Sequence, residues 1–112
     1  RNDIFDIKLI LTATFNTTGR AQLVAKYLYT TKRTDVDIGI GIYTDPGNRN
    51  GGVGPQMPWA ADYDLNTYPG KIYQDGISQA KEILKTGTKS NPIYLVAIAP
   101  NSNLGVIFSE NP

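Results

Sequence analysis

Residues 6–28, DIKLILTATFNTTGRAQLVAKYL, contain the two patterns that decide the fold. Residues 6–14 are nearly continuously apolar and include β-branched side chains, which is typical of a strand covered on both faces. After a short polar turn, in which Thr17 or Thr18 can cap a helix, apolar residues recur at helical spacing. These residues are Ala21, Val24, Ala25 and Leu28. The stretch therefore predicts a buried strand followed by an amphipathic helix.

The rest of the chain continues this alternation. Residues 37–43 alternate isoleucine with glycine, so we expect a strand whose glycine face lies close to a helix or a ligand. Helical spacing returns over residues 73–85, and residues 93–99, IYLVAIA, predict a third buried strand. A final helix follows, which Ser102 can cap. We therefore predict an α/β fold, a partial Rossmann-like, mostly parallel sheet with flanking helices in the order βαβαβα.

Three polar segments are expected to share one rim of this sheet. They are residues 14–18, the long irregular segment 44–70, and residues 99–103. Each contains residues that follow a predicted strand, and ligands of parallel sheets bind beyond the carboxyl ends of the strands. A loop as long as the middle segment is usually functional or mobile in a compact domain.

Composition limits the classes of function. The 112 residues correspond to one domain, and the net charge of +1 is spread without a basic stripe, so we expect no nucleic acid and no membrane as partner. No apolar run reaches the length of a membrane span. The chain has no cysteine and no histidine, which excludes thiolate metal sites and the commonest general base. Any metal would need oxygen ligands, which favours calcium or magnesium.

Asn16 is the first candidate site residue. Its amide can donate and accept hydrogen bonds at once, which suits a sugar hydroxyl or a carboxylate. The alternative is a turn residue or helix cap, which the position alone favours somewhat. Asn16-Thr17-Thr18 is also a glycosylation sequon, but a strand end that faces a cleft is a poor place for a glycan.

The other two rim segments carry further candidates. Trp59 and Tyr63 lie in the middle segment among aspartates, where aromatic rings can stack on a flat ligand or pin the loop to the sheet. The sequence supports these two interpretations equally. The last segment follows a strand that ends at Ala99-Pro100, which leaves backbone carbonyls that suit a hard cation. An ordinary turn capped by Ser102 or Asn103 is the alternative there, and the spacing favours it.

Three ordered blocks of the sequence resemble the inosine–uridine-preferring nucleoside hydrolases. They are 9-LILTATFNTTGRAQLVAKYL-28, 33-RTDVDIGIGI-42 with 58-PWAADYDLNTYPG-70, and 95-LVAIAPNSNLG-105. The resemblance implies an enzyme that cleaves the N-glycosidic bond of ribonucleosides to ribose and free base. In this family a Ca²⁺-bound water attacks, an aspartate takes its proton, and the ribosyl group passes through an oxocarbenium-like state.

The resemblance also implies roles for individual residues. Asn16 matches the family's active-site asparagine, which binds substrate beside the metal. Ile98 matches the residue whose backbone carbonyl is a calcium ligand. Trp59 and Tyr63 would lie near the nucleobase of a small-molecule nucleoside. The resemblance leaves open whether the full-length parent protein forms a homo-oligomer.

The family's catalytic aspartates have no counterpart in this sequence. Its D-x-D-x-x-x-D-D turn would precede Arg1, and a later aspartate and histidine would follow Pro112. We therefore interpret residues 1–112 as a single partial nucleoside-hydrolase-like domain, a fragment without catalytic residues, without activity when isolated, and marginally stable because its sheet edges are exposed. Two alternatives remain: a non-catalytic α/β relative that binds a nucleoside, a sugar or a protein, and an unrelated small α/β domain.

Overall fold

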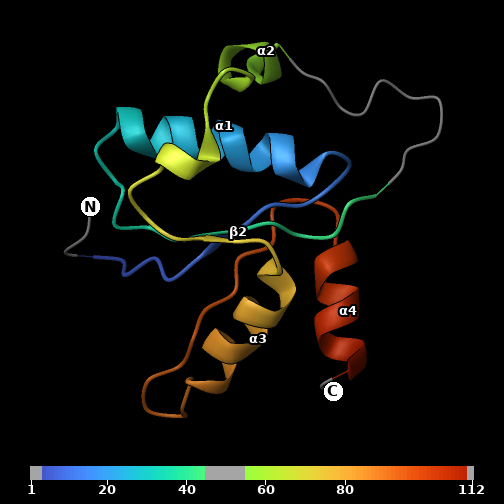
Figure 1. Ribbon diagram of the computed structural model, residues 1–112. Helices are drawn as coiled ribbons and strands as arrows, with labels where there is room; N and C mark the ends of the chain where they lie inside the picture. The colour runs from blue at the N-terminus through green and yellow to red at the C-terminus, as the bar shows by residue number, and fades with distance from the viewer. Residues whose placement is uncertain (1–3, 45–54, 111–112) are drawn as a thin grey trace.

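In the computed structural model, which describes residues 4–44 and 55–110, helices alternate with the strands of a small sheet (Figure 1). The sheet has the strand order β1-β2-β3, and both neighbouring pairs are parallel. The α/β class and the parallel sheet predicted from the sequence are therefore confirmed. The elements are β1 (Ile10–Leu11), α1 (Thr17–Thr30), β2 (Ile38–Gly39), α2 (Gln56–Ala60), the 3-10 helix η1 (Leu65–Thr67), β3 (Ile72–Tyr73), α3 (Gly76–Lys85) and α4 (Ser102–Glu110).

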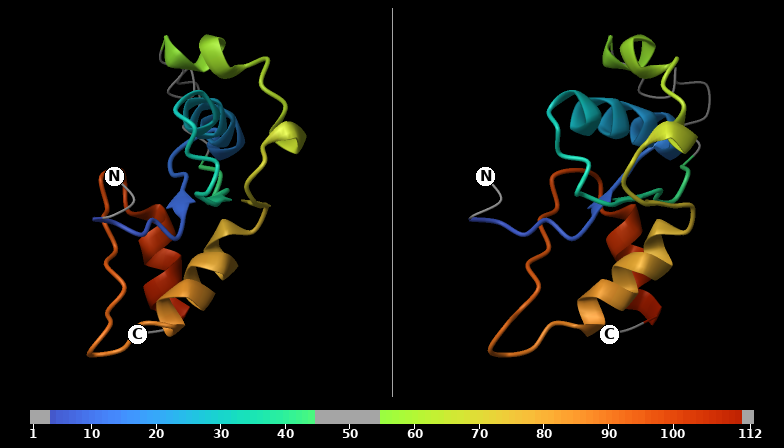
Figure 2. Two further views of the ribbon diagram at one scale, coloured as in Figure 1. Left: turned by 90° about the vertical axis from the view of Figure 1, so that its left-hand side faces the viewer. Right: turned by 60° about the vertical axis from the view of Figure 1, so that its left-hand side comes forward.

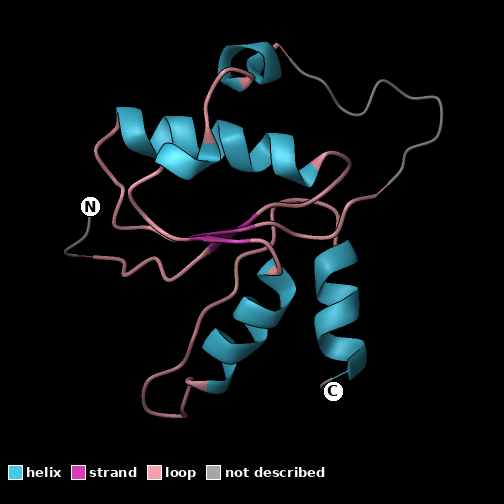
Figure 3. Ribbon diagram, viewed as in Figure 1, coloured by secondary structure: helices cyan, strands magenta, loops and turns pink. Residues whose placement is uncertain are grey.

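Helices lie on both sides of the sheet. α1 covers one face, with α2 outside it, whereas α3 and α4 lie on the opposite side (Figures 1 and 2). The hydrogen-bonded strands are short, so much of the backbone around them is loop (Figure 3). None of the helices in the described ranges has both the length and the apolar character that crossing a bilayer requires.

The hydrophobic core lies between β2 and α1. Ile38 of the central strand is fully buried, which contributes roughly 1.5–3 kcal/mol for a side chain of this size. The α1 face predicted from the sequence packs against it, with Ala21, Ala25 and Leu28 buried and Val24 partly buried. Tyr68, which precedes β3 in the chain, is buried in the same hydrophobic cluster.

The glycine face predicted for residues 37–43 is approached by two helices, which confirms that prediction. A Cβ atom on Gly39 would lie 3.0 Å from the Cα atom of Gly76, the first residue of α3. A Cβ atom on Gly41 would lie 2.6 Å from Nδ2 of Asn103 in α4. Glycine at both positions therefore lets α3 and α4 pack against this part of the chain.

β1 is shorter than the strand predicted for residues 6–14. Its ladder covers Ile10–Leu11 and continues through one further bond, from the Thr12 N–H to the Gly39 oxygen at 2.9 Å. Residues 6–8 are exposed, so their predicted burial is wrong. The reason is that β1 is the outermost strand of the sheet in the described residues.

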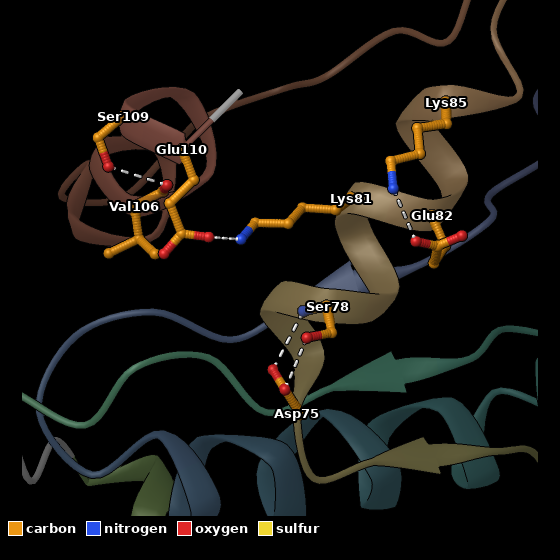
Figure 4. A network of polar contacts seen from close by, with 8 residues as sticks. All are labelled: Asp75, Ser78, Lys81, Glu82, Lys85, Val106, Ser109 and Glu110. Atoms are coloured by element: carbon orange, nitrogen blue, oxygen red, sulfur yellow. Dashed lines mark hydrogen bonds and ion pairs between the residues drawn. The ribbon is translucent and has the colours of Figure 1, made fainter. Parts of the chain in front are cut away.

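The helix predicted for residues 73–85 begins later, because β3 precedes it. Ile38 N–H donates to the Lys71 oxygen at 2.9 Å, which fixes Ile72–Tyr73 beside β2. Asp75 then caps α3: its Oδ1 atom accepts from the Ser78 N–H at 3.0 Å (Figure 4). The apolar residues of β3 continue the apolar spacing of α3, so this spacing alone could not separate the strand from the helix.

Residues 93–99 form no strand, and the third buried strand predicted there is wrong. Tyr94, Val96 and Ile98 are 85%, 79% and 93% exposed, and the sheet of the described residues does not include this segment. An apolar run becomes a buried strand only where a neighbour covers it. The helix predicted after it is present as α4, and an ion pair between Lys81 and Glu110 links it to α3 (Figure 4).

Candidate functional site

The carboxyl ends of β1 and β2 meet the start of α4 (Figure 1). The Phe15 N–H donates to Oγ1 of Thr44 at 2.7 Å, and the Thr44 N–H donates to the Phe15 oxygen at 3.3 Å. Asn103 reaches both strands from α4. The rim was predicted from residues 14–18, 44–70 and 99–103, and the structure brings together residues 14–18, the start of the middle segment and the start of α4. We call residues 14–18, residue 44 and residues 99–103 the polar rim.

Asn103 holds the polar rim together from inside. It is 5% exposed, its Nδ2 donates to the Thr12 oxygen at 2.9 Å, and its Oδ1 accepts from the Ile42 N–H at 3.0 Å. The Thr12 hydroxyl donates to the Thr17 oxygen at 3.0 Å and accepts from the Gly41 N–H at 3.3 Å. These bonds join β1, β2, α1 and α4 in one network, which fixes the rim's geometry.

The sequence named Asn103 only as a possible helix cap and missed this bridging role. Its partners lie 91 and 61 residues earlier in the chain. A hint in the sequence is Gly41, on the glycine face of the strand predicted for residues 37–43, because such a face is approached closely by another group. Local spacing cannot show that this group is Asn103.

Asn16 caps α1 at the surface of the polar rim. The residue is exposed, and its Oδ1 accepts from the Gly19 N–H at 2.9 Å. Asn16 is therefore the helix cap, as the alternative interpretation of this residue predicted, and the expected caps Thr17 and Thr18 lie within the helix. The cap engages one lone pair of the amide oxygen, and an amide has further donors and acceptors.

The backbone that leads to Asn16 is held in an unfavourable conformation. Thr14 and Phe15 have φ angles of 77° and 55°, which costs roughly 1–3 kcal/mol for each non-glycine residue. Arg20 Nε donates to the Thr14 oxygen at 2.8 Å, and Thr44 holds Phe15. Among the residues that the structure describes, the buried Thr14 hydroxyl has no hydrogen-bond partner. Strain of this kind persists where the surroundings impose it, and it concentrates at functional sites.

Trp59 and Tyr63 lie against α1, away from Asn16. Lys26 Nζ lies 4.7 Å from the centre of the Trp59 ring, and the rings of Tyr63 and Tyr29 are 6.2 Å apart. Lys26 is ten residues beyond Asn16, about 15 Å along the helix. The structure therefore does not bring these aromatics to Asn16, and their contacts are those of a loop pinned to the domain.

The predicted rim position is wrong for residues 55–70, and the topology explains why. β3 runs parallel to β2, so the connection must return to the amino end of the sheet before β3 can begin. Only the start of this connection can lie at the carboxyl rim, as Thr44 does. Residues 45–54 of the predicted segment lie outside the described residues.

The described rim does not fit a calcium ion by itself. Calcium takes 6–8 oxygen ligands, among them carboxylates, and residues 12–18, 40–44 and 99–103 contain no aspartate or glutamate. Over the described ranges, no group of three or more potential side-chain ligands forms. Ile98, whose carbonyl is the predicted ligand, lies in the exposed segment before the rim. We therefore derive no reaction step through a metal.

The ionisable groups with shifted pKa values lie in contacts that stabilise helices and loops. Hydrogen bonds from Ser78 lower the pKa of Asp75, and a hydrogen bond from Lys26 lowers that of Asp62. Burial raises the pKa of Tyr68 to about 12, and its hydroxyl donates to the Val36 oxygen at 2.6 Å. Asp75 follows β3 at the same edge as the polar rim, but its carboxylate is engaged in capping α3.

Comparisons of the chain with protein-family models, with curated protein sequences and with solved structures found no match. The resemblance to nucleoside hydrolases therefore rests on the quoted blocks of sequence, and it stays a prediction.

Proposed function

We propose that this chain carries the ribose-binding part of a nucleoside-hydrolase-like site at the polar rim. One observation carries the proposal: Asn16 is exposed where the carboxyl end of β1 turns into α1, the place where parallel sheets bind ligands. The resemblance assigns the same residue to the active site. The sequence and the geometry thus favour the same side chain.

The chemistry of Asn16 suits a ribose. The sugar's vicinal hydroxyls both donate and accept hydrogen bonds, and a primary amide does the same. Asn16 stays fixed because the preceding Thr14 and Phe15 are held by Arg20 and Thr44. A fixed amide loses little entropy when it binds, which favours affinity for the sugar.

Cleavage of the N-glycosidic bond needs groups that the described rim lacks. A base must take a proton from water, and calcium, when bound, makes that water more acidic. We assign neither role to a residue of this chain. A hydrolase built on this rim needs carboxylates from residues other than those described, and we expect the chain alone to bind nucleoside without turnover. Trp59 and Tyr63 are not part of the proposed site.

A titration of the isotope-labelled chain with inosine and uridine, with and without Ca²⁺, tests the proposal by NMR. We expect saturable shifts at the amides of Phe15, Asn16 and Thr44, and no release of free base. Free ribose should produce the same pattern more weakly. Shifts confined to α2, or none at all, would refute ribose binding at the rim.

Asn16→Ser separates the ligand role from the capping role. Serine caps a helix about as well as asparagine, so α1 should keep its stability, but the amide is lost. We expect nucleoside binding to weaken by about tenfold or more, which corresponds to about 1.4 kcal/mol. Trp59→Phe is the matched control and should leave binding unchanged. Equal binding by wild type and Asn16→Ser contradicts the proposed role.

A non-catalytic nucleoside- or sugar-binding protein is the second candidate, and the neutral character of the polar rim favours it. The two candidates differ in the larger protein that contains this sequence. Release of free base from inosine or uridine by that protein supports the hydrolase, whereas binding without release supports the binding protein.

A further inference from the structure

The capping role of Asn16 leaves the nitrogen of its side-chain amide free. Its Oδ1 accepts from the Gly19 N–H at 2.9 Å, whereas its Nδ2 has no hydrogen-bond partner among the residues that the structure describes. This nitrogen carries both N–H donors of the amide, and the residue is exposed. A ligand oxygen that accepts a hydrogen bond from the Asn16 side chain must therefore approach Nδ2.

Gly19 shows which other group surrounds Nδ2. A Cβ atom on Gly19 would lie 2.7 Å from Nδ2 of Asn16 and 2.6 Å from Cε of Met57. The amide nitrogen and the methyl group are thus neighbours of the same point above the first turn of α1. A side chain at position 19 would displace one of them, so glycine lets both occupy this place. A ligand bound to Nδ2 therefore lies next to the Met57 methyl group.

Met57 is held near the start of α1 because α2 is attached to α1. The short helix α2 lies over α1 on the side away from the sheet (Figure 1). Near its carboxyl end, Lys26 Nζ donates to the Trp59 oxygen and lies 4.7 Å from the centre of the Trp59 ring. Met57 itself is only partly exposed. Its methyl group is therefore part of a fixed surface beside Asn16.

The covalent structure of a nucleoside places its base next to a sugar hydroxyl. The ribose carbon that carries the base is bonded directly to a carbon that carries a hydroxyl. If Asn16 Nδ2 donates to the oxygen of this hydroxyl, the base lies close to Nδ2 and hence to the Met57 methyl group. A thioether side chain is apolar and polarisable, and it makes favourable contacts with flat aromatic rings.

We propose that Met57 is a specificity-determining residue of the ribose site and packs against the nucleobase. The inference rests on the proposed function, because it requires Asn16 to bind the sugar. It assigns the contact with the base to the residue of α2 that lies beside Asn16, in place of Trp59 and Tyr63. A nucleoside then contacts both Asn16 and Met57, whereas free ribose contacts Asn16 alone.

Met57 is the only methionine of the chain, so an isotope-labelled methionine methyl group gives one NMR signal, which Met57→Leu assigns. We expect inosine and uridine to shift this signal with the same saturation curve as the Asn16 amide, because the base acts on the methyl group through its ring current. Free ribose should shift the Asn16 amide alone. An Asn16 shift without a Met57 shift on adding inosine overturns the inference and leaves the proposed function standing. No shift at Asn16 overturns both.

Met57→Gln separates contact with the base from packing of α2. Glutamine has nearly the length of methionine but ends in a polar amide, so we expect the affinity for inosine to fall about three- to tenfold and the affinity for ribose to stay unchanged. Met57→Leu keeps an apolar side chain and should retain most of the inosine affinity. Trp59→Phe is the matched control in the same helix and should change neither affinity. An equal loss for inosine and ribose in Met57→Gln, or no loss, contradicts the inference.

Discussion

Gly41 shows how one residue can decide whether the polar rim forms. A Cβ atom at this position would lie 2.0 Å from the Thr12 oxygen and 2.7 Å from Oδ1 of Asn103. Both neighbours belong to the buried network, so neither can move without breaking hydrogen bonds. Gly105 is the opposite case, because its Cβ atom would meet nothing within 4 Å in the middle of α4.

Alanine substitutions at these two glycines should therefore have opposite effects. We expect Gly41→Ala to lower the free energy of unfolding by about 3 kcal/mol or more, as overpacking at fixed backbone does. Gly105→Ala should raise it by about 0.5–1 kcal/mol, because alanine favours a helix interior. Urea unfolding monitored by circular dichroism measures both. Equal effects would mean that Gly41 is not enclosed as the structure shows.

Asn103 makes a second prediction at the residue scale. Asn103→Leu keeps the number and branching of the heavy atoms but leaves the Thr12 oxygen and the Ile42 N–H unpaired, and each buried unpaired group costs about 1–3 kcal/mol. We expect a loss of about 2–4 kcal/mol in the same assay. The control is Gln74→Leu at an exposed position outside the helices, which should change stability by less than about 0.5 kcal/mol. A small effect at Asn103 would contradict its bridging role.

At the scale of elements, Asp75 links the start of α3 to pH. Hydrogen bonds from Ser78 hold the pKa of Asp75 below its ordinary value of 3.8. A carboxyl whose pKa is lowered by folding stabilises the fold above pH 3.8, and this contribution is lost as the pH falls through the lowered pKa.

We expect the stability of the wild type to fall below pH 3.8 more steeply than that of Asp75→Asn. Asparagine keeps the cap but cannot titrate, so the difference isolates the carboxyl. Thermal unfolding at a series of pH values measures it. Parallel curves for the two proteins would show that Asp75 titrates alike in the folded and unfolded chain.

The elements also show which features the sequence could predict. The spacing of Ala21, Ala25 and Leu28 predicted α1 because a helix records its buried face in local periodicity. Residues 93–99 carry an equally clear apolar pattern, but burial of a strand depends on neighbours that are distant in sequence. The apolar pattern therefore shows that the segment is suited to a strand, but it does not show that the segment is paired.

The candidate site likewise contains residues whose positions the sequence predicts and residues whose positions it does not. Asn16 lies between β1 and α1 as predicted, because the end of an apolar strand and the start of a helix fix its position, whereas its role as a ligand group stays a prediction. Trp59 and Tyr63 lie away from Asn16, because the chain returns to the amino end of the sheet before β3 begins, and local sequence patterns do not show this return. Asn103 was missed as a bridge, because its partners are distant in sequence.

At the scale of the whole molecule, order should decrease from the centre of the sheet toward residues 93–98. β2 is paired on both sides: Ile38 N–H donates to the Lys71 oxygen and Ile40 N–H to the Tyr73 oxygen, each at 2.9 Å. Both residues are buried. The radius of gyration is 14.5 Å, somewhat above the value of about 13 Å typical of this length, as expected when part of the chain lies outside the core.

Hydrogen exchange of the free chain measures this gradient directly. We expect the amides of Ile38 and Ile40 to exchange only through global unfolding, because breaking either bond requires opening the core. The amides of Tyr94, Val96 and Ile98 should exchange at rates close to those of an unfolded peptide, because no strand in the described ranges pairs with them. The same rates at several protein concentrations serve as the control for self-association. Strong protection at Val96 in the monomer would show that residues 93–98 are paired within the chain, and both the exposed segment and the open edge of β1 would then have to be abandoned.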